Sequence, residues 1–474
     1  MVDASLPPLT LSWHDMQRIA AQVNDLILEH FITLDEMPVT SPLTQQALND
    51  GLYEPVPVDA TPMPQLLAQL KTQVFDNMTH LDHPRNFSFV PGPSNFISAM
   101  ADAIASSLNV FCGGFLGPSG VAQIELTVIE WLRELFRFPQ EAGGLLVSGG
   151  SMANMTGLAV ARHVMLANNP ANAVVYFSDQ THSSVPKGLK ILGFQQHQIR
   201  KISSDANFRL PMKVLRQRIA ADRLQGIVPF CVVANAGTTN TGAVDPLKEL
   251  SEFCKAEGLW LHVDGAYGGS ATITPRGQRV LEGLELADSL AIDPHKWLFQ
   301  PYETGFVLIR NRQHLKDMFK FSAEYLKAQE QNSEQTNFCD YGMQLTRGFR
   351  ALKLWLSLKA FGIDTFREAI TLGIENAEYV QLLLEASPDW EIITAAQLGI
   401  ITFRYVREGL DEKGLNALNN HIAQQIILSG FALLSPTMLD EKYVLRMCTI
   451  NPRTTHDDLD RTVELLWQFG KNGF

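Results

Sequence analysis

Short apolar runs alternate with helical segments between about residue 85 and residue 370 of the chain. Each run has the length of a buried strand, and the intervening stretches carry apolar residues at helical spacing. Because strands joined by crossover helices form a mostly parallel sheet, this order predicts a large α/β domain. The predicted strands are Gly144–Val147, Ala173–Phe177, Ile227–Ala234, Leu259–Val263, Leu290–Ile292 and Gly305–Ile309.

The N-terminal part carries a different pattern. Apolar positions recur at helical spacing over residues 12–33, and Ser12 is placed to cap the helix at Asp15. Prolines crowd residues 38–64, which are expected to be extended and to link this helix to the body. Residues 1–84 are therefore predicted to form a helical arm with an apolar face to bury.

The last hundred residues predict a smaller α/β domain. We assign residues 85–370 to the large domain and residues 371–474 to the small one. The small domain is expected to contain a helix at Ile374–Glu385, strands at Gly399–Tyr405 and Tyr443–Cys448, and a final helix at His456–Phe469.

Composition narrows the class of protein. With 46% hydrophobic and 19% charged residues in 474, the chain is expected to be globular, and its net charge of -12 argues against nucleic acid or an anionic membrane as a partner. The weakly polar stretch at residues 96–116 is interrupted by polar residues and predicts a buried helix with an exit loop. The five cysteines show no zinc-like spacing, and no secretory signal pattern precedes them, so a cytoplasmic protein without a metal site is expected.

Polar or small residues follow almost every predicted strand. In parallel sheets, ligands bind beyond the carboxyl ends of the strands, so these loops are the expected site. They read SGGSMAN from residue 148, SDQTHSS from 178, NAGTTN from 235, DGAYGG from 264 and DPHKW from 293.

Two of these loops suit an anionic group and a flat ring. Gly150 and Ser151 stand at a predicted helix start, where backbone N–H groups and the helix dipole attract an anion; a plain tight turn is the alternative. His182 follows a strand and offers an imidazole that can lie flat against a planar ring. An ordinary polar histidine is the alternative there.

The other loops supply a carboxylate and an amine. Asp264 suits a cationic ring nitrogen, and its small neighbour Ala266 leaves room for a flat ring; helix capping is the alternative. Lys296 alone would be read as a solvated charge, but a partly desolvated lysine forms imines with aldehydes. Lysine, anion cradle and ring-directed aspartate together are typical of a pyridoxal phosphate (PLP) enzyme.

The motifs SDQTHSSV, HVDGAYGG, DPHKWL and FRALKLW resemble the group II PLP decarboxylases, which act on aromatic amino acids, histidine or glutamate. The resemblance runs from about residue 10 to the C-terminus and implies a fold of type I, like that of aspartate aminotransferase. It implies that Lys296 forms the imine with PLP, His182 stacks on the pyridine ring, Asp264 pairs with the ring nitrogen, and Gly150, Ser151, Asp293 and His295 bind the phosphate.

The resemblance also assigns residues near the substrate. Tyr325 matches the catalytic tyrosine of a loop that closes over the substrate, and Phe89 falls in a substrate-side segment. Arg347 resembles the arginine that meets the α-carboxylate in glutamate decarboxylases; a structural ion pair is the alternative. Asn235 stands where the family often has threonine, which leaves its contact with the cofactor open.

The expected reaction is decarboxylation of an L-amino acid, and an aromatic one is the leading substrate. Phenylalanines such as Phe111 and Phe115 would line an apolar pocket, or belong to the ordinary core. Glutamate, diaminobutyrate, histidine or an aliphatic amino acid remain alternatives, as do an aldehyde synthase and a non-catalytic PLP-binding protein. Tyr325 favours simple decarboxylation. In relatives the N-terminal arm packs on a second subunit, which predicts a homodimer.

Overall fold

The computed structural model describes residues 7–41, 43–113, 119–320 and 336–473. Its large domain is built on a seven-stranded sheet in the order β1-β7-β6-β5-β4-β2-β3. Neighbouring strands from β3 to β6 run parallel, and β7 is antiparallel to both of its neighbours, which confirms a mostly parallel sheet. The strands are β1 (Gly143–Val147), β2 (Ala173–Ser178), β3 (Ile199–Ile202), β4 (Val228–Asn235), β5 (Trp260–Asp264), β6 (Ser289–Ile292) and β7 (Gly305–Ile309).

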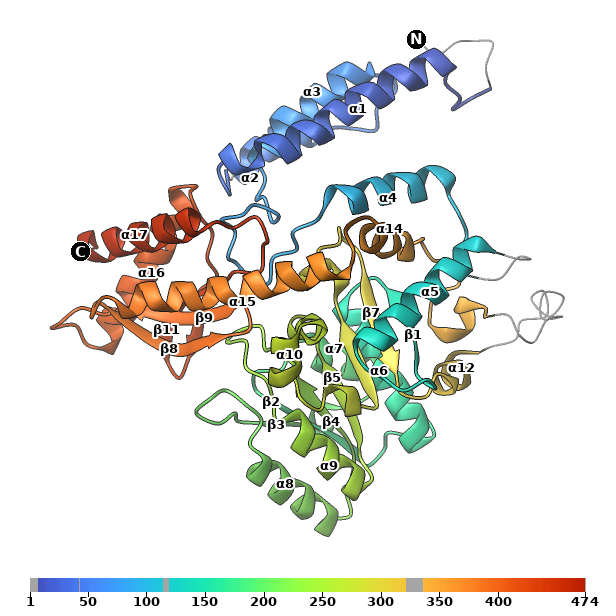
Figure 1. The fold of residues 1–474 in the computed structure, drawn as a ribbon, viewed down its shortest axis with the longest axis vertical. Helices are drawn as coiled ribbons and strands as arrows, with labels where there is room; N and C mark the ends of the chain where they lie inside the picture. Colours follow the sequence, from blue (N-terminus) through green and yellow to red (C-terminus); the bar gives the residue numbers. More distant parts are fainter. Residues whose placement is uncertain (1–6, 42, 114–118, 321–335, 474) are drawn as a thin grey trace.

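Helices cover both faces of this sheet (Figure 1). The connections through α6 and α7 move along the sheet in one direction and those through α8 and α9 in the other, so right-handed crossovers place the two pairs on opposite faces. The large-domain helices are α4 (Phe96–Leu108), α5 (Gly120–Leu135), α6 (Gly150–Leu166), α7 (Ser184–Ile191), α8 (Met212–Leu224), α9 (Leu247–Glu257), α10 (Pro275–Val280), α11 (Pro294–Trp297), α12 (Gln313–Phe319) and α14 (Ala351–Phe361).

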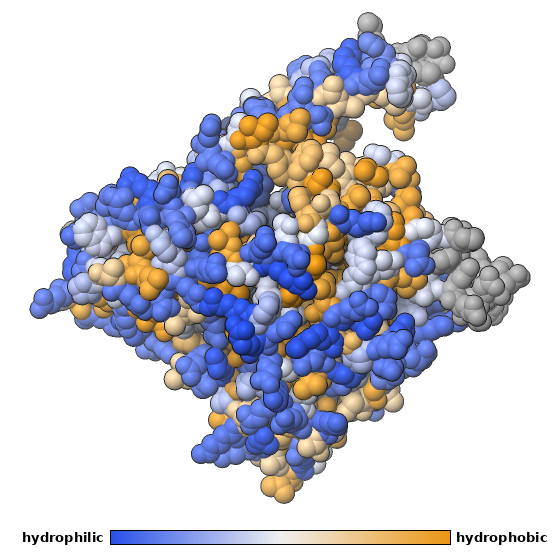
Figure 2. Space-filling view, viewed as in Figure 1, coloured by the Kyte–Doolittle hydropathy of each residue, from blue (hydrophilic) through white to orange (hydrophobic). Residues whose placement is uncertain are grey.

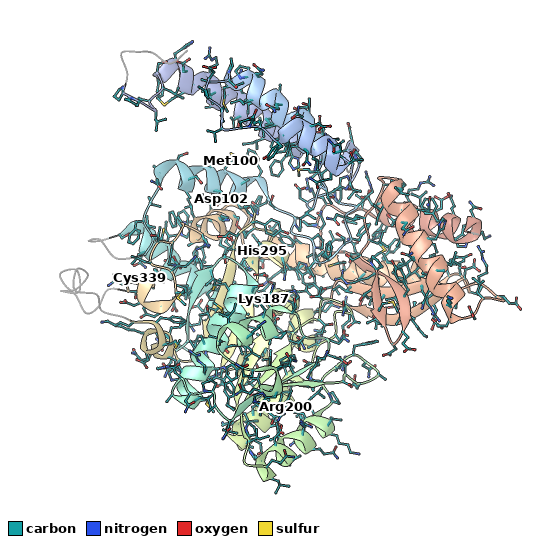
Figure 3. All side chains as sticks on the ribbon, turned by 180° about the vertical axis from the view of Figure 1, so that it is seen from behind. Met100, Asp102, Lys187, Arg200, His295 and Cys339 are labelled. Carbon is teal, nitrogen blue, oxygen red and sulfur yellow. The ribbon has the colours of Figure 1, made fainter. Side chains whose placement is uncertain are left out.

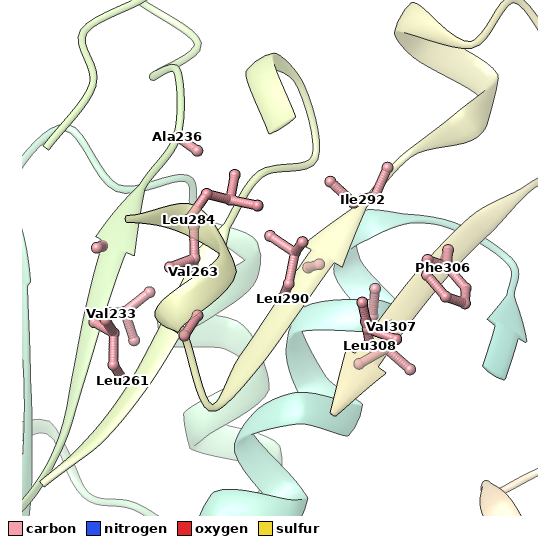
Figure 4. Close-up of a cluster of buried hydrophobic side chains, with 14 of the residues drawn as sticks. Val233, Ala236, Leu261, Val263, Leu284, Leu290, Ile292, Phe306, Val307 and Leu308 are labelled. Carbon is pink, nitrogen blue, oxygen red and sulfur yellow. The ribbon is translucent and has the colours of Figure 1, made fainter. Parts of the chain in front are cut away.

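The central strands are apolar on both faces because helices cover both. Val263 and Leu290 from neighbouring parallel strands are fully buried, as are Phe306 and Val307 on β7 (Figure 4). Continuous apolar runs of this kind are typical of parallel sheets. The six predicted strands are confirmed to within a residue or two, whereas β3, at the edge and only partly buried, carries too little apolar signal to be found.

The C-terminal domain has a four-stranded antiparallel sheet in the order β10-β11-β9-β8 and a separate apolar core. The predicted domain boundary at residue 370 falls inside α15, which contributes Ile370 to the large core and Val380 to the small one. The elements are α15 (Ile363–Glu385), β8 (Trp390–Gln397), β9 (Ile400–Tyr405), α16 (Glu412–Leu428), β10 (Thr437–Leu439), β11 (Lys442–Cys448) and α17 (His456–Asn472).

The N-terminal arm consists of α1 (Trp13–Thr33), α2 (Gln45–Leu52) and α3 (Met63–Gln73), and it projects from the body (Figure 1). The predicted first helix is confirmed, and Ser12 caps it by accepting a hydrogen bond from the N–H of Asp15. The expectation that residues 38–64 are extended is wrong for α2, because Thr44 caps a helix between the prolines. None of the three helices contains a buried residue.

Helix α4 begins at the predicted place but is not the buried helix that was expected. Ser98 and Ala101 are its buried residues, whereas Leu108 is 66% exposed. The reason is its position at the rim of the body, facing the arm; Figure 2 shows hydrophobic surface gathered there and along the arm. In the described part of the chain, no helix is long and apolar enough to cross a membrane.

Candidate active site

A cavity of about 280 Å³ lies beyond the carboxyl ends of the parallel strands. All five loops singled out in the sequence contribute to its wall. Figure 3 shows one lining residue, His295, near the centre of the molecule. The cavity is lined by every residue predicted to contact the cofactor: Gly150, Ser151, His182, Asn235, Asp264, Ala266, Asp293, His295 and Lys296.

Lys296 reaches the cavity from α11, a single turn that starts at Asp293 with Pro294 in its first position. Its Nζ lies 3.1 Å from Asp293 Oδ2, and its side chain is 24% exposed. His295 Nε2 lies 3.5 Å from the same oxygen. Desolvation lowers the pKa of His295, so its imidazole is neutral at pH 7. The helical turn thus presents an amine and an imidazole side by side.

The start of α6 faces this turn at close range. A Cβ on Gly150 would lie 2.7 Å from Asp293 Oδ2, and one on Gly149 would lie 3.1 Å from His295 Cε1. Only glycine leaves this gap open, so the N–H groups at the helix start remain accessible to an anion. Asp293 Oδ1 is buried and has no hydrogen-bond partner among the described residues, which marks it as a group that awaits a ligand.

Asp264 also lines the cavity, at the last position of β5. Its Oδ1 accepts a hydrogen bond from the N–H of Ala266 at 3.1 Å, and its Oδ2 accepts one from Asn154 Nδ2 at 2.9 Å. Both donors fix the direction of the carboxylate, and its remaining lone pairs are available to a cationic ring nitrogen.

His182 lines the same cavity from the loop after β2. Its Nδ1 is 2.9 Å from Ser184 Oγ and accepts the N–H of Ser184 at 3.2 Å. Desolvation lowers the pKa of His182, against the opposing charge of Asp264, and this favours the neutral ring. Because Nδ1 is an acceptor, the proton of the neutral imidazole is on Nε2.

Asn235 lines the cavity, but its side chain is engaged within the protein. Its Nδ2 donates to Asp245 Oδ2 at 2.9 Å and to the hydroxyls of Ser178 and Thr181. Burial raises the pKa of Asp245 to about 6. Contact between Asn235 and the cofactor therefore stays a prediction.

The predicted substrate side is less closely defined. Phe89 is 66% exposed, has a positive φ of 47° and lies outside the cavity lining. The nearby Gly92 does approach the site, since a Cβ there would lie 2.5 Å from the carbonyl oxygen of His295. Tyr302, which sequence reasoning missed, has its ring centroid 4.8 Å from that of His295. Tyr325 and Phe115 lie outside the described residues.

Arg347 is buried in a closed ion pair. It donates to Glu125 Oε2 at 3.1 Å and Oε1 at 2.5 Å, and to the carbonyl oxygens of Cys112 and Leu146. It does not line the cavity. This geometry matches the structural ion pair that was the alternative for Arg347, and it leaves the predicted contact with a substrate carboxylate without support.

Arg446 on β11 has the opposite environment. It is almost fully buried, and none of its three guanidinium nitrogens has an oxygen or nitrogen acceptor among the described residues; its polar side-chain contact is the weakly accepting thiol of Cys448. Burial lowers its pKa, and its nearest ionisable neighbours are Cys448 and Tyr267, of which Tyr267 lines the cavity. An arginine within the apolar strand sequence YVLRMC was the signal that could have identified it.

The described residues contain no group of three histidine, cysteine or acidic side chains arranged to hold a metal ion. An amine, an anion-binding helix start, a neutral imidazole and a ring-directed carboxylate share one cavity. These residues fit PLP, since one cavity offers an amine to its aldehyde, a carboxylate to its ring nitrogen and the backbone N–H groups of a helix start to its phosphate.

Comparison with known proteins agrees with this assignment. The family described as "Pyridoxal-dependent decarboxylase conserved domain" matches residues 45–406. The chain is 48% identical to aromatic-L-amino-acid decarboxylase of Bacillus atrophaeus over 95% of its own length and 94% of that protein. It is 30% identical to phenylacetaldehyde synthase of Petunia hybrida over 97% and 94% of the two chains. The crystal structure of Oryza sativa TDC with PLP and tryptamine superposes with a TM-score of 0.93 at 26% identity, covering 98% and 99%.

The chain belongs to the pyridoxal-dependent decarboxylase family. It is a PLP-dependent carboxy-lyase with the fold expected from the sequence, so the predicted class, cofactor and fold are confirmed. The roles of the individual site residues stay predictions.

Proposed function

We propose that this enzyme decarboxylates an aromatic L-amino acid to the corresponding amine and CO2. The observation that carries this proposal is the 48% identity to an aromatic-L-amino-acid decarboxylase along nearly the whole of both chains. The small residue Ala266 at the cavity wall, and the Tyr302 ring beside His295, are compatible with a planar side chain.

In this proposal each end of the cavity holds one part of the cofactor. Lys296 binds the aldehyde carbon, Asp264 the ring nitrogen, and Gly150, Ser151 and His295 the phosphate. Bound PLP supplies an electron-poor conjugated ring that stabilises negative charge at the substrate α-carbon. Asp264 keeps the ring nitrogen protonated, and its two fixed hydrogen bonds hold the carboxylate in the required direction.

The proton that replaces CO2 at the α-carbon needs a donor. Tyr325, which lies outside the described residues, is the predicted donor. Because Nδ1 accepts the Ser184 N–H, His182 presents its Nε2–H and can hold a proton near the same carbon.

We assign the substrate α-carboxylate to Arg446 instead of Arg347. Arg347 already has four hydrogen bonds inside the protein, whereas Arg446 is buried with its guanidinium unpaired behind the cavity wall at Tyr267. Burying a charge without a partner costs on the order of several kcal/mol of folding free energy. A buried arginine without an anionic partner therefore indicates that a ligand supplies the missing negative charge.

A panel of L-amino acids, assayed for CO2, amine, aldehyde and hydrogen peroxide, tests the proposal. We expect tryptophan, tyrosine, phenylalanine or DOPA to give amine and CO2 in equal amounts. Aldehyde with peroxide as main products would instead establish the synthase activity that the name of the Petunia relative records. Turnover restricted to glutamate, diaminobutyrate, histidine or aliphatic amino acids would exclude the aromatic assignment.

We also propose a homodimer in a reducing cytoplasm. The three helices of the arm contain no buried residue, and Trp13 and Ile32 on α1 are exposed together with Leu108 on α4. A second copy related by a twofold axis would cover these apolar faces. The five cysteines are free thiols, four of them buried, as expected in a reducing compartment.

A further inference from the structure

A buried chain of polar side chains lies behind the two cofactor contacts Asp264 and His182. Its members come from four different elements, and each is less than a tenth exposed. Sequence reasoning assigned no role to any of them, although three stand inside the motifs SGGSMAN, SDQTHSS and HVDGAYGG. They are Asn154 on α6, Ser184 on α7, Trp260 and His262 on β5, and Ser289 on β6.

The direction of every hydrogen bond in this chain is determined by its two ends. Trp260 Nε1 is a donor only, and it donates to Ser289 Oγ at 2.8 Å. The Ser289 hydroxyl is then free to donate to His262 Nδ1, also at 2.8 Å. Asp264 at the other end is a carboxylate and accepts from Asn154 Nδ2. The links between these ends therefore have one consistent assignment.

His262 and Asn154 connect the two halves. His262 Nε2 lies 2.9 Å from Asn154 Oδ1. Turning the amide over would place Oδ1 against the carboxylate, so Nδ2 must face Asp264, and His262 must carry its proton on Nε2. Burial lowers the pKa of His262 to about 4, which keeps this neutral tautomer at neutral pH. Space for the ring comes from Gly157, where a Cβ would lie 2.8 Å from His262 Cε1.

Asn154 also has a second branch. Its Nδ2 lies 3.0 Å from Ser184 Oγ, so that hydroxyl accepts from the amide and donates its own hydrogen to His182 Nδ1 at 2.9 Å. Asn154 thus donates one amide hydrogen to Asp264 and the other to Ser184, whose hydroxyl fixes the tautomer of His182.

We infer that Asn154 is a positioning residue that sets the direction of the Asp264 carboxylate and the proton position of His182 together, with His262 holding its amide in place. The two cofactor contacts are consequently linked by one side chain, which also reaches the cavity wall. This inference rests on the proposed roles of Asp264 and His182.

The test measures PLP affinity by titrating the apoenzyme, together with the visible absorbance and induced circular dichroism of the reconstituted protein. Asn154→Ala removes both donors, and we expect the PLP dissociation constant to rise about 10-fold to 100-fold, as for a lost buried hydrogen bond to a charged group. Asn154→Asp places a second carboxylate against Asp264, so it should weaken PLP binding more than Asn154→Ala does. Both variants should alter the circular dichroism of the bound cofactor, because His182 is no longer fixed.

Thr156→Ala is the matched control, since Thr156 is buried on the same helix and bonds the carbonyl oxygen of Met152 alone. It should bind PLP within about twofold of the wild type. His262→Gln retains an N–H donor toward Asn154 and His262→Leu does not. We expect the PLP dissociation constants of these two variants to differ about tenfold. This pair tests the inference if the Asn154→Ala apoprotein fails to fold.

Asp264→Ala separates the possible failures. If Asp264→Ala weakens PLP binding while both Asn154 variants and both His262 variants bind like the wild type with an unchanged spectrum, the inference is wrong and the proposed site stands. If Asp264→Ala also binds PLP normally, the proposed role of Asp264 fails with it.

Discussion

The cofactor cavity and the N-terminal arm both contain groups that the chain alone does not satisfy: polar atoms without partners in and behind the cavity, and uncovered apolar side chains on the arm. Around the cavity, buried polar side chains such as Asn154, Asn235 and Asp264 have partners within the chain. Asp293 Oδ1 and the Arg446 guanidinium lack such partners and mark where ligands are expected. In the arm, apolar side chains stay exposed, and Ile32 is 76% accessible. An unsatisfied group in the cavity indicates a small molecule, and an uncovered face on the arm indicates a protein surface.

The difference predicts that damage to the cavity and damage to the arm have separable effects. Cavity variants should change cofactor binding and turnover without changing the mass of the protein. Arm variants should change the mass first.

Lys296→Ala is expected to have the largest effect. Without the amine the protein should lose its visible absorbance and at least about 10³-fold in kcat, because the cofactor loses its covalent partner and the reaction loses a proton-transferring group. Lys187→Ala on α7, whose side chain is exposed near His182, is the matched lysine control and should keep the absorbance. Absorbance retained in Lys296→Ala would contradict the assignment.

The two buried arginines sharpen the contrast between satisfied and unsatisfied groups. Arg347→Met leaves Glu125 buried and unpaired, so it should destabilise the apoprotein by about 3–5 kcal/mol. Arg446→Met removes a charge that has no partner, so the apoprotein should be no less stable, while KM for the amino acid rises about tenfold or more. Urea unfolding and steady-state kinetics measure the two effects. The reverse pattern would restore Arg347 as the substrate arginine.

Ile32→Asp tests the arm. A charge on a face that a second subunit covers should weaken the dimer by about 2 kcal/mol or more, with kcat falling only in proportion to the dimer lost. Asn24→Asp, on the exposed part of the same helix, adds the same charge and should leave the dimer intact. Sedimentation analysis at several concentrations gives the dissociation constants. A wild-type protein that is monomeric at micromolar concentration would contradict the proposal.

The pH dependence of stability should show both regions at once. Burial lowers the pKa of His83, at the junction of arm and body, and of His262, behind the cavity, to about 4. The unfolded chain, with histidine pKa near 6.5, binds more protons between these values. The stabilisation is therefore complete above pH 6.5 and is lost as the pH falls toward 4.

Between pH 7 and pH 5 each of these histidines should cost the apoprotein about 2 kcal/mol of unfolding free energy. Urea titrations at a series of pH values measure the slope. His83→Gln and His262→Gln should each remove about 2 kcal/mol of this pH-dependent loss. A wild-type stability that is constant over this range would show that one or both rings are accessible to protons in the native state.

The sequence allowed much of the cavity to be predicted, because its residues directly follow apolar strands and parallel strands bring their carboxyl ends together. The buried chain of polar side chains through Asn154 and His262 could not be predicted. Its contacts depend on how α6 packs on the sheet. The sequence around Arg347 and Arg446 does not show which of the two is paired. Only the fold brings Glu125, more than two hundred positions away in the chain, into an ion pair with Arg347. The edge strand β3 and helix α2 were missed because their signals are short and polar.

The central claim is that PLP is held on Lys296 within this cavity. Borohydride reduction of the holoenzyme fixes the cofactor to the lysine that binds it, and peptide mass mapping then identifies that lysine. We expect a single pyridoxyl group on the peptide containing Lys296. A label on Lys187, on Lys353 or on no lysine would contradict it.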